Sequence, residues 1–229
     1  ASFAMMQPRP ELGGNATTEA RYAANRLRVM RQVHYSTKNH NSLDLVFFVN
    51  GIPVATAELK TDFTQSVNDA KQQYRTDRKP AGEPLLGFGT RALVHFAVSN
   101  DEVWMTTKLA GADTRFLPFN RGNHGHAGNA PDPLGLTSPT AYLWEEVWQR
   151  DRWLEILSKF MHYETVTTTD AATGKKTKSQ VLIFPRYHQL DAVTKLLADV
   201  RVSGPGQRYL IQHSAGSGKT RTIAWTAHR

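Results

Sequence analysis

The stretch Ser42–Lys60, SLDLVFFVNGIPVATAELK, decides the fold of this chain. Two apolar runs flank Asn50-Gly51, a dipeptide typical of a tight turn between antiparallel strands, so the stretch predicts a β-hairpin. Charged residues stand at its two outer ends, Asp44 on the first strand and Glu58-Leu59-Lys60 on the second. Charge in such apolar surroundings is costly, which favours a functional role for these groups.

Those charged residues match the chemistry of a metal-dependent phosphodiesterase. Carboxylate oxygens are ligands that Mg²⁺ prefers, and a nearby lysine can orient or deprotonate the attacking water. The pattern therefore predicts Asp44, Glu58 and Lys60 as catalytic residues, with Asp44 and Glu58 as metal ligands. The alternative is that these residues have no catalytic role, because a surface Glu/Lys pair on a strand is common in proteins.

A metal ion shared by Asp44 and Glu58 would require a particular register between the two strands. A two-residue loop would place Asp44 opposite Ala57, and Asp44 and Glu58 would then point to opposite faces of the sheet. A shared metal requires both carboxylates on one face. The hypothesis therefore predicts an odd-length loop or a β-bulge near Asn50–Ile52.

A second motif, HSAGSGKT at residues 213–220, resembles the phosphate loop of an ATPase. Backbone amides of such a loop wrap phosphates at a helix N-terminus, a lysine reaches the terminal phosphates and a hydroxyl ligates Mg²⁺. The motif predicts ATP and Mg²⁺ as cofactors, with Thr220 as a metal ligand. The cofactor-binding residues would be Gly216, Ser217, Gly218, Lys219 and Thr220. His213 stands where glycine or alanine is usual.

The rest of the chain predicts helices alternating with strands, and hence an α/β fold with helices on the faces of a sheet. The expected helices are Thr17–Arg31, Thr64–Arg78 (capped by Thr64), Leu143–Met161 and Tyr187–Val200. The expected strands outside the hairpin are Gln32–Tyr35, Ala92–Ser99, Val103–Lys108, Val181–Phe184 and Tyr209–Gln212, and residues 115–139 are expected to form an irregular loop. We expect residues 1–164 to form a nuclease domain with a connecting helix, 165–179 an exposed linker or hairpin, and 180–229 the start of an ATPase domain.

Composition narrows the function classes. The chain of 229 residues carries 28 Lys and Arg against 20 Asp and Glu, a formal charge of +8 that favours a polyanionic partner such as nucleic acid. The absence of cysteine excludes disulfides and cysteine-ligated zinc. No apolar run is long enough to cross a bilayer and no secretory signal is recognisable, so the sequence predicts a cytoplasmic protein without a membrane partner.

Taken together, the motifs resemble the restriction (R) subunit of type I restriction–modification enzymes. The resemblance rests on RQVHYS, the hairpin stretch, DAKQQYRTDR, LVHFAVSNDEVWMTTKLAG, RFLPFNRG, YLWEEVWQRD, FPRYHQLDAV and HSAGSGKT, and runs from about Arg21 onward. It implies a PD-(D/E)xK nuclease with a mixed sheet, followed by the opening of a RecA-like superfamily 2 DNA-translocase motor. The intact enzyme would couple ATP-driven movement along double-stranded DNA to Mg²⁺-dependent cleavage, in a complex with modification (methyltransferase) and specificity subunits.

The resemblance also implies roles for single residues. Gln189 would belong to a segment that contacts adenine. The family has a Gln-x-x-x-Tyr motif on the helix after Glu-x-Lys. Here Tyr74 matches the tyrosine of the motif, but Ala70 stands at the position of its glutamine, and Gln72 or Gln73 could replace that glutamine. The resemblance therefore implies Gln72, Gln73 and Tyr74 as candidate DNA contacts. Glu19 is a poor match to an early acidic metal ligand.

Two alternatives remain open from the sequence, a helicase–nuclease of DNA repair and a DNA-binding scaffold whose nuclease site is inactive. The chain is expected to be a fragment, and because the second acidic motif of the motor is missing, it is expected not to hydrolyse ATP by itself.

Overall fold

A computed structural model describes residues 5–10, 13–61 and 65–229. The chain divides into two compact units, residues 1–184 and residues 185–229. Among the described residues, no helix has the length and apolar character needed to span a membrane.

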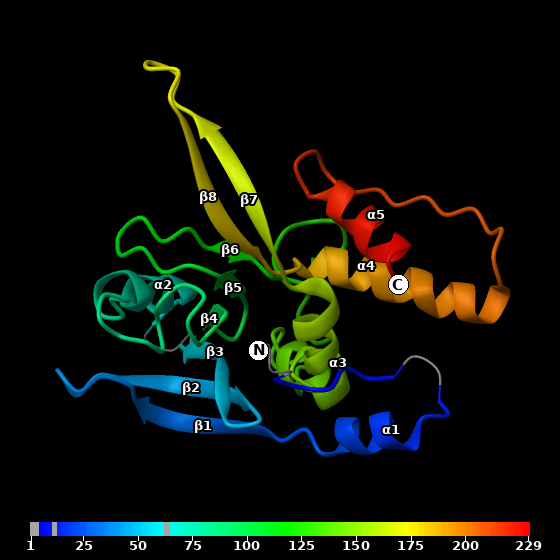
Figure 1. Ribbon diagram of the computed structural model, residues 1–229, viewed down its shortest axis with the longest axis horizontal. Coiled ribbons are helices and arrows are strands. Elements are labelled where there is room, and N and C mark those ends of the chain that lie inside the picture. Colours follow the sequence, from blue (N-terminus) through cyan, green and yellow to red (C-terminus); the bar gives the residue numbers. More distant parts are fainter. Residues whose placement is uncertain (1–4, 11–12, 62–64) are drawn as a thin grey trace. The chain divides into compact units, whose positions relative to one another are not determined.

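The first unit is built on a mixed six-stranded sheet whose strands follow one another in chain order (Figure 1). Its strands are β1 (Leu27–His34), β2 (Ser42–Val49), β3 (Ile52–Leu59), β4 (Val94–Val98), β5 (Val103–Thr106) and β6 (Leu117–Pro118). Only the β3–β4 pair is parallel; the other neighbours are antiparallel. The expected mixed sheet flanked by helices is therefore confirmed.

The predicted hairpin is confirmed as β2 and β3. Val49 pairs with Ile52 across a two-residue turn, and both turn residues have positive φ, 50° at Asn50 and 84° at Gly51. Positive φ at both central positions is the geometry that matches the twist of the flanking strands, and Asn-Gly adopts it readily.

The register shifts between Phe47 and Phe48 of β2, because Phe48 pairs with Pro53 whereas Phe47 pairs with Ala55. Val54 is therefore an extra residue on β3, a β-bulge a short distance from the turn. The predicted bulge is confirmed, although it lies farther along the strand than Ile52.

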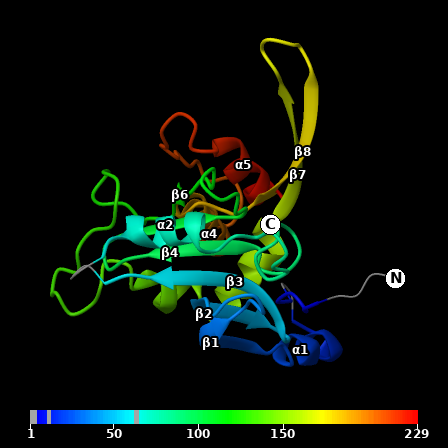
Figure 2. The same cartoon turned by 90° about the vertical axis from the view of Figure 1, so that its left-hand side faces the viewer.

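Helix α2 (Val67–Thr76) makes the crossover from β3 to β4 and covers one face of the sheet (Figure 2). The expected cap, Thr64, lies outside the described residues. Ser66 caps the helix instead, in a reciprocal capping box with Asp69. The core on this face is a cluster of buried apolar side chains from the sheet, α2 and the loops beyond it: Leu43, Val46, Val67, Ala70, Tyr74, Leu86, Ala97, Leu109 and Phe116.

The opposite face of the sheet packs against a helical segment that is not continuous. The expected helix Leu143–Met161 is wrong in detail: two π-helical segments, η1 (Leu143–Val147) and η2 (Ile156–Phe160), flank α3 (Arg150–Glu155). The break lies at Gln149, whose backbone is extended (φ −67°, ψ 145°). The break coincides with packing of Trp148 on Phe47 and Phe96, with ring centroids 4.5 and 5.5 Å apart.

The expected helix Thr17–Arg31 is also wrong in its second half. Helix α1 covers only Ala16–Ala23, and strand β1 begins at Leu27. Asn25, which is buried, donates its side-chain amide to the Tyr22 carbonyl and ends the helix. The backbone beyond it pairs with β2 from Leu27 to His34, interrupted at Gln32, so sheet pairing overrides the local helical pattern of this segment.

The polar segment 165–179 lies within a second, two-stranded sheet, the hairpin of β7 (His162–Thr169) and β8 (Lys176–Ile183). The division between the two units falls after Phe184, since β8 pairs along its length with β7 and thereby belongs to the first unit.

The second unit contains helices α4 (Tyr187–Ser203) and α5 (Lys219–Ala227). The expected strand Tyr209–Gln212 is wrong: residues 207–214 have no regular structure, and residues 185–229, all of which are described, contain no strand. A strand requires a neighbour to satisfy its backbone groups, and this unit offers none.

Candidate active site

Asp44 and Glu58 share the α2-facing side of the sheet. Leu45 pairs with Ala57, and extending that register by one residue places Asp44 directly opposite Glu58. Directly opposed residues of antiparallel strands point to the same face. Without the bulge at Val54 they would diverge, so the extra residue on β3 is what brings the two carboxylates together.

Glu58 is fully buried, with 0% of its surface exposed. Its Oε1 accepts a hydrogen bond from Nε of Arg78 at 2.7 Å, and its Oε2 is buried without a hydrogen-bond partner among the described residues. Burial raises the pKa of Glu58 to about 7; Arg78 opposes that rise, and the nearby Asp44 carboxylate adds to it.

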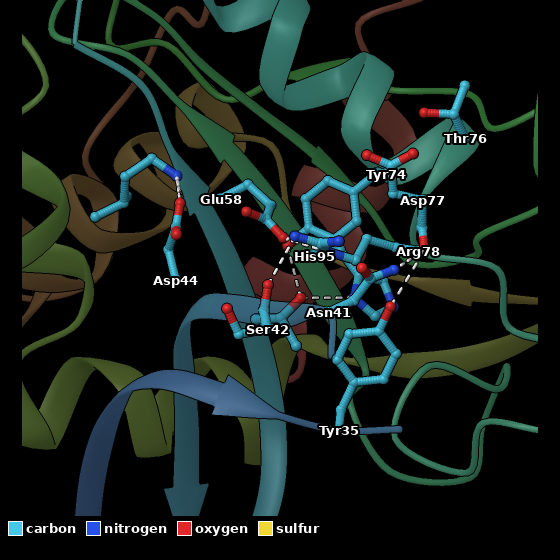
Figure 3. A network of polar contacts seen from close by, with 12 residues as sticks. Tyr35, Asn41, Ser42, Asp44, Glu58, Tyr74, Thr76, Asp77, Arg78 and His95 are labelled. Carbon is cyan, nitrogen blue, oxygen red and sulfur yellow. Dashed lines mark hydrogen bonds and ion pairs between the residues drawn. The ribbon is translucent and has the colours of Figure 1, made fainter. Parts of the chain in front are cut away.

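Arg78 follows the end of α2 and is itself held in place. Its second guanidinium nitrogen donates to the Ser42 carbonyl at 2.7 Å, and its guanidinium carbon lies 5.9 Å from the ring centroid of Tyr35. Figure 3 shows the side chains of Asp44 and Arg78 on either side of Glu58. One cation thus holds one oxygen of the buried carboxylate and leaves the other available.

Asp44 is fixed from both neighbouring strands. Its Oδ1 accepts from the Gln32 amide on β1 at 3.0 Å, and its Oδ2 accepts from the Leu59 backbone N–H on β3 at 2.8 Å. Gln32 has φ of +50°, a strained conformation for a non-glycine residue in a strand, and its Oε1 also accepts from the Ser42 hydroxyl at 2.9 Å.

A buried polar group lies beneath the carboxylates. The Thr56 hydroxyl is 2.7 Å from the Tyr74 hydroxyl and 2.8 Å from Nδ1 of His95. All three side chains are buried, and burial lowers the pKa of His95 to about 3, which keeps its ring neutral.

The candidate DNA contacts on α2 are not equivalent. Tyr74 is fully buried and its hydroxyl is engaged with Thr56, so this geometry corrects the expectation that it contacts DNA; its position is that of a core residue. Gln72 is exposed, whereas Gln73 is half-buried and its Oε1 has no partner among the described residues.

Lys60 follows β3 directly, and its backbone N–H donates to the Val98 carbonyl at 2.8 Å. Within the described part of the chain its ammonium group makes no hydrogen bond or ion pair. Its charge reaches Asp69, whose pKa is lowered chiefly by hydrogen bonds with Ser66 and further by Lys60. Lys60 is therefore close to the site but not engaged with Glu58.

The donor set fits a divalent cation. An orphaned buried carboxylate oxygen at Glu58 and the Asp44 carboxylate on the same face are hard oxygen ligands, and Mg²⁺ commonly takes only one or two carboxylates and fills its other positions with water and phosphate oxygens. No group of three or more His, Asp or Glu side chains suited to a metal occurs among the described residues, so Glu19 does not complete one.

Two residues of this site escaped sequence reasoning, Arg78 and Gln32. The only available signal for Arg78 was its spacing of four from Tyr74 on the predicted helix. The signal for Gln32 was weaker still, because it becomes the neighbour of Asp44 only once β1 and β2 are known to pair.

In the second unit, the HSAGSGKT loop ends at Gly218, which caps α5 with φ of +83°. The Lys219 ammonium group folds back onto the loop and donates to the carbonyls of His213 and Ser214 at 2.8 and 3.0 Å. The loop thus precedes the N-terminus of α5, and the ammonium group of its lysine is bonded to the loop's own carbonyls.

Gln189 lies against this loop. Its Nε2 donates to the carbonyls of Ser217 and Gly218 at 3.2 and 3.0 Å, and its Oε1 accepts from the Arg186 backbone N–H at 2.9 Å. Both ends of the amide are therefore used within the protein, where the sequence suggested an adenine contact.

Residues 15–114 match the family model described as the type I restriction enzyme R protein N terminus. A search of curated proteins gave no match. The matched span contains Asp44, Glu58, Lys60 and the helix α2. The resemblance stated from the sequence is confirmed over this span: residues 15–114 are similar to the N-terminal region of type I restriction enzyme R proteins.

Proposed function

We propose that the first unit is the nuclease of a type I restriction enzyme and cuts DNA phosphodiester bonds with the help of Mg²⁺. One observation carries the proposal: a bulge places Asp44 opposite Glu58, and the buried Oε2 of Glu58 has no partner. An unpaired buried carboxylate oxygen is costly, and a divalent cation would remove that cost.

Each residue has a distinct task in this proposal. Asp44 and Glu58 would hold the cation, which when bound supplies a Lewis acid for the scissile phosphate. Gln32 and Leu59 orient Asp44, and Arg78 holds Oε1 of Glu58 so that Oε2 faces the ligand. Lys60, whose ammonium group is not engaged in the described structure, would orient the attacking water or take its proton.

We propose that the second unit is the opening of the RecA-like motor, with ATP and Mg²⁺ bound by residues 216–220 and the hydroxyl of Thr220 on the metal. In support, the loop lies at the N-terminus of α5 and is braced by Gln189. ATP-driven movement along duplex DNA would belong to the intact enzyme, in a complex with modification and specificity subunits. Co-purification with a methyltransferase would favour restriction over the repair helicase–nuclease.

A second candidate, a DNA-binding scaffold with an inactive site, is favoured by the Arg78–Glu58 ion pair. A buried cation beside Glu58 opposes the binding of a second cation there. The two candidates differ in whether the chain cleaves DNA.

The test is nicking of supercoiled plasmid by the full chain with Mg²⁺ and with EDTA. Glu58→Gln and Lys60→Ala should each abolish Mg²⁺-dependent nicking, because one removes a metal ligand and the other the group that handles the water. Lys195→Ala, which changes an exposed lysine of α4, is the matched control and should nick normally. Equal nicking by Lys60→Ala and the unchanged protein would reject the assignment of Lys60, and absence of nicking by the unchanged protein would favour the scaffold.

A further inference from the structure

The hairpin of β7 and β8 extends away from the rest of the first unit in both ribbon views (Figures 1 and 2). Its strands pair without interruption from His162–Ile183 at the base to Thr169–Lys176 at the tip. From Thr165 to Gln180 every side chain is exposed. A two-stranded ribbon with so little burial gains little stability from packing, so its length calls for an explanation outside the core.

The register assigns its side chains to two faces. Lys176 lies opposite Thr169, Lys178 opposite Thr167, and Gln180 opposite Thr165, and opposed residues share a face. This surface, which we call the lysine–threonine face, consists of Thr165, Thr167, Thr169, Lys176, Lys178 and Gln180. Each of these side chains can donate a hydrogen bond, and none is apolar or acidic.

The hairpin carries three lysines against two acidic residues, Glu164 near its base and Asp170 at its tip. Lys175, at the turn, adds to the two lysines of the lysine–threonine face, and the described structure contains no ion pair for any of the three. Asp170 is the acidic residue of the tip, and its Oδ1 is occupied by the backbone N–H of Ala172 and both the N–H and hydroxyl of Thr173. The lysines therefore present their charge to solvent.

We propose that the β7–β8 hairpin is an arm that binds the phosphate backbone of duplex DNA through its lysine–threonine face. Lysines and threonine hydroxyls are among the side chains that contact DNA phosphates, and a two-stranded ribbon fits the width of the major groove. The choice of DNA as the polyanion rests on the proposed nuclease function; the surface itself rests on register, exposure and charge.

The dimensions suit this partner. An eight-residue strand is about 27 Å long at roughly 3.4 Å per residue, close to one turn of B-DNA at about 34 Å. Lys176 and Lys178 are two residues apart, about 7 Å, which equals two base steps along one DNA strand. The proposed contacts are to phosphates alone, so the arm should bind without sequence preference.

The experiment measures binding of a fluorescent duplex of mixed sequence to the full chain in EDTA, where cleavage does not occur, across a series of salt concentrations. The variant combines Lys175→Gln, Lys176→Gln and Lys178→Gln. Each lost phosphate contact reduces the magnitude of the negative slope of log K against log salt by about 0.9. The salt dependence of the variant should therefore be weaker by roughly 2 to 3 in this slope. Thr168→Ala with Thr177→Ala, on the opposite face, is the matched control and should leave the slope unchanged.

A second variant distinguishes the loss of charge from misfolding of the hairpin. Replacing the same lysines by arginine keeps the charge and should restore the slope. An unchanged slope in the glutamine variant overturns the proposal. An equal decrease of the slope in the arginine variant overturns it as well. If the glutamine variant binds DNA normally but no longer binds a specificity subunit, the arm is a protein-docking element. Because no cleavage is measured, a failed nuclease assay with an intact salt effect would reject the nuclease proposal and leave the arm standing.

Discussion

Arg78 and Glu58 form a buried ion pair, with Nε and Oε1 2.7 Å apart and 5% and 0% of the two side chains exposed. The pair joins the end of α2 to β3, and Arg78 opposes the rise that burial causes in the pKa of Glu58. A buried pair of this kind contributes little net stability, but breaking it from one side leaves an uncompensated charge.

Arg78→Met should therefore destabilise the first unit by about 3–5 kcal/mol at pH 8, because Glu58 then loses the cation that offsets its burial. The measurement is urea unfolding followed by tryptophan fluorescence. The double variant Arg78→Met with Glu58→Gln should recover most of the loss, since neither charge remains. If the single and double variants are equally unstable, the loss comes from packing of the arginine and not from the unpaired carboxylate.

The stability of the protein should fall with rising pH because of Glu58. Burial raises its pKa to about 7 from an ordinary value of 4.5. Below pH 4.5 the group is protonated in both the folded and unfolded states, and its contribution is fully present. As pH rises from 4.5 to 7 the unfolded chain releases the proton first, so that contribution is lost.

The loss should be of the order of 3 kcal/mol, from about 1.4 kcal/mol per pKa unit. It is measured as the difference in unfolding free energy between the unchanged protein and Glu58→Gln at pH 4.5, 6 and 8. A difference that does not depend on pH over this range would contradict the raised pKa.

His95 should make the protein sensitive to acid in the opposite direction. Burial lowers its pKa from 6.5 to about 3, so the folded state holds a neutral ring. Its contribution is present above pH 6.5 and is lost as pH falls toward 3, because the unfolded chain takes up the proton first; the loss amounts to roughly 5 kcal/mol.

His95→Asn keeps an acceptor near the Thr56 hydroxyl and should unfold with a shallower dependence on pH below 6.5, although its stability at pH 7 is lower. His126→Gln, in an exposed loop, is the control and should follow the unchanged protein. Parallel pH curves for the unchanged protein and His95→Asn would refute the assignment.

Gly218 and Gly216 provide a matched pair in the second unit. Both have positive φ, 83° and 72°, so alanine is strained by about 1–2 kcal/mol at either position. A Cβ on Gly218 would lie 2.3 Å from Nε2 of Gln189, whereas one on Gly216 meets nothing within 4 Å. Gly218→Ala should therefore weaken binding of a fluorescent ATP analogue more than Gly216→Ala does.

Adding Gln189→Ala to Gly218→Ala tests the cause of that difference. The shorter side chain removes the clash but not the backbone strain, so the double variant should bind the analogue better than Gly218→Ala alone. Equal binding by the two single variants would show that Gln189 moves aside freely and does not brace the loop.

The sequence by itself determined the local elements whose signals are short-range. The Asn50-Gly51 turn, the hairpin around it and helix α2 follow from turn chemistry and periodicity, which act within a few residues. The requirement for a bulge could also be derived, because side chains alternate along a strand and two ligands of one metal must share a face.

The tertiary structure decided everything that depends on which strands pair. It ended α1 at Ala23 and made Leu27–His34 an edge strand, because the outer side of β2 pairs along its length with that segment. It also brought Arg78 to Glu58 and Gln32 to Asp44, contacts between residues 20 and 12 positions apart. Local propensity carries no information about such partners, because they come into contact only when the sheet and α2 pack together. Burial in the packed structure then shifts the pKa of each group and so decides its charge.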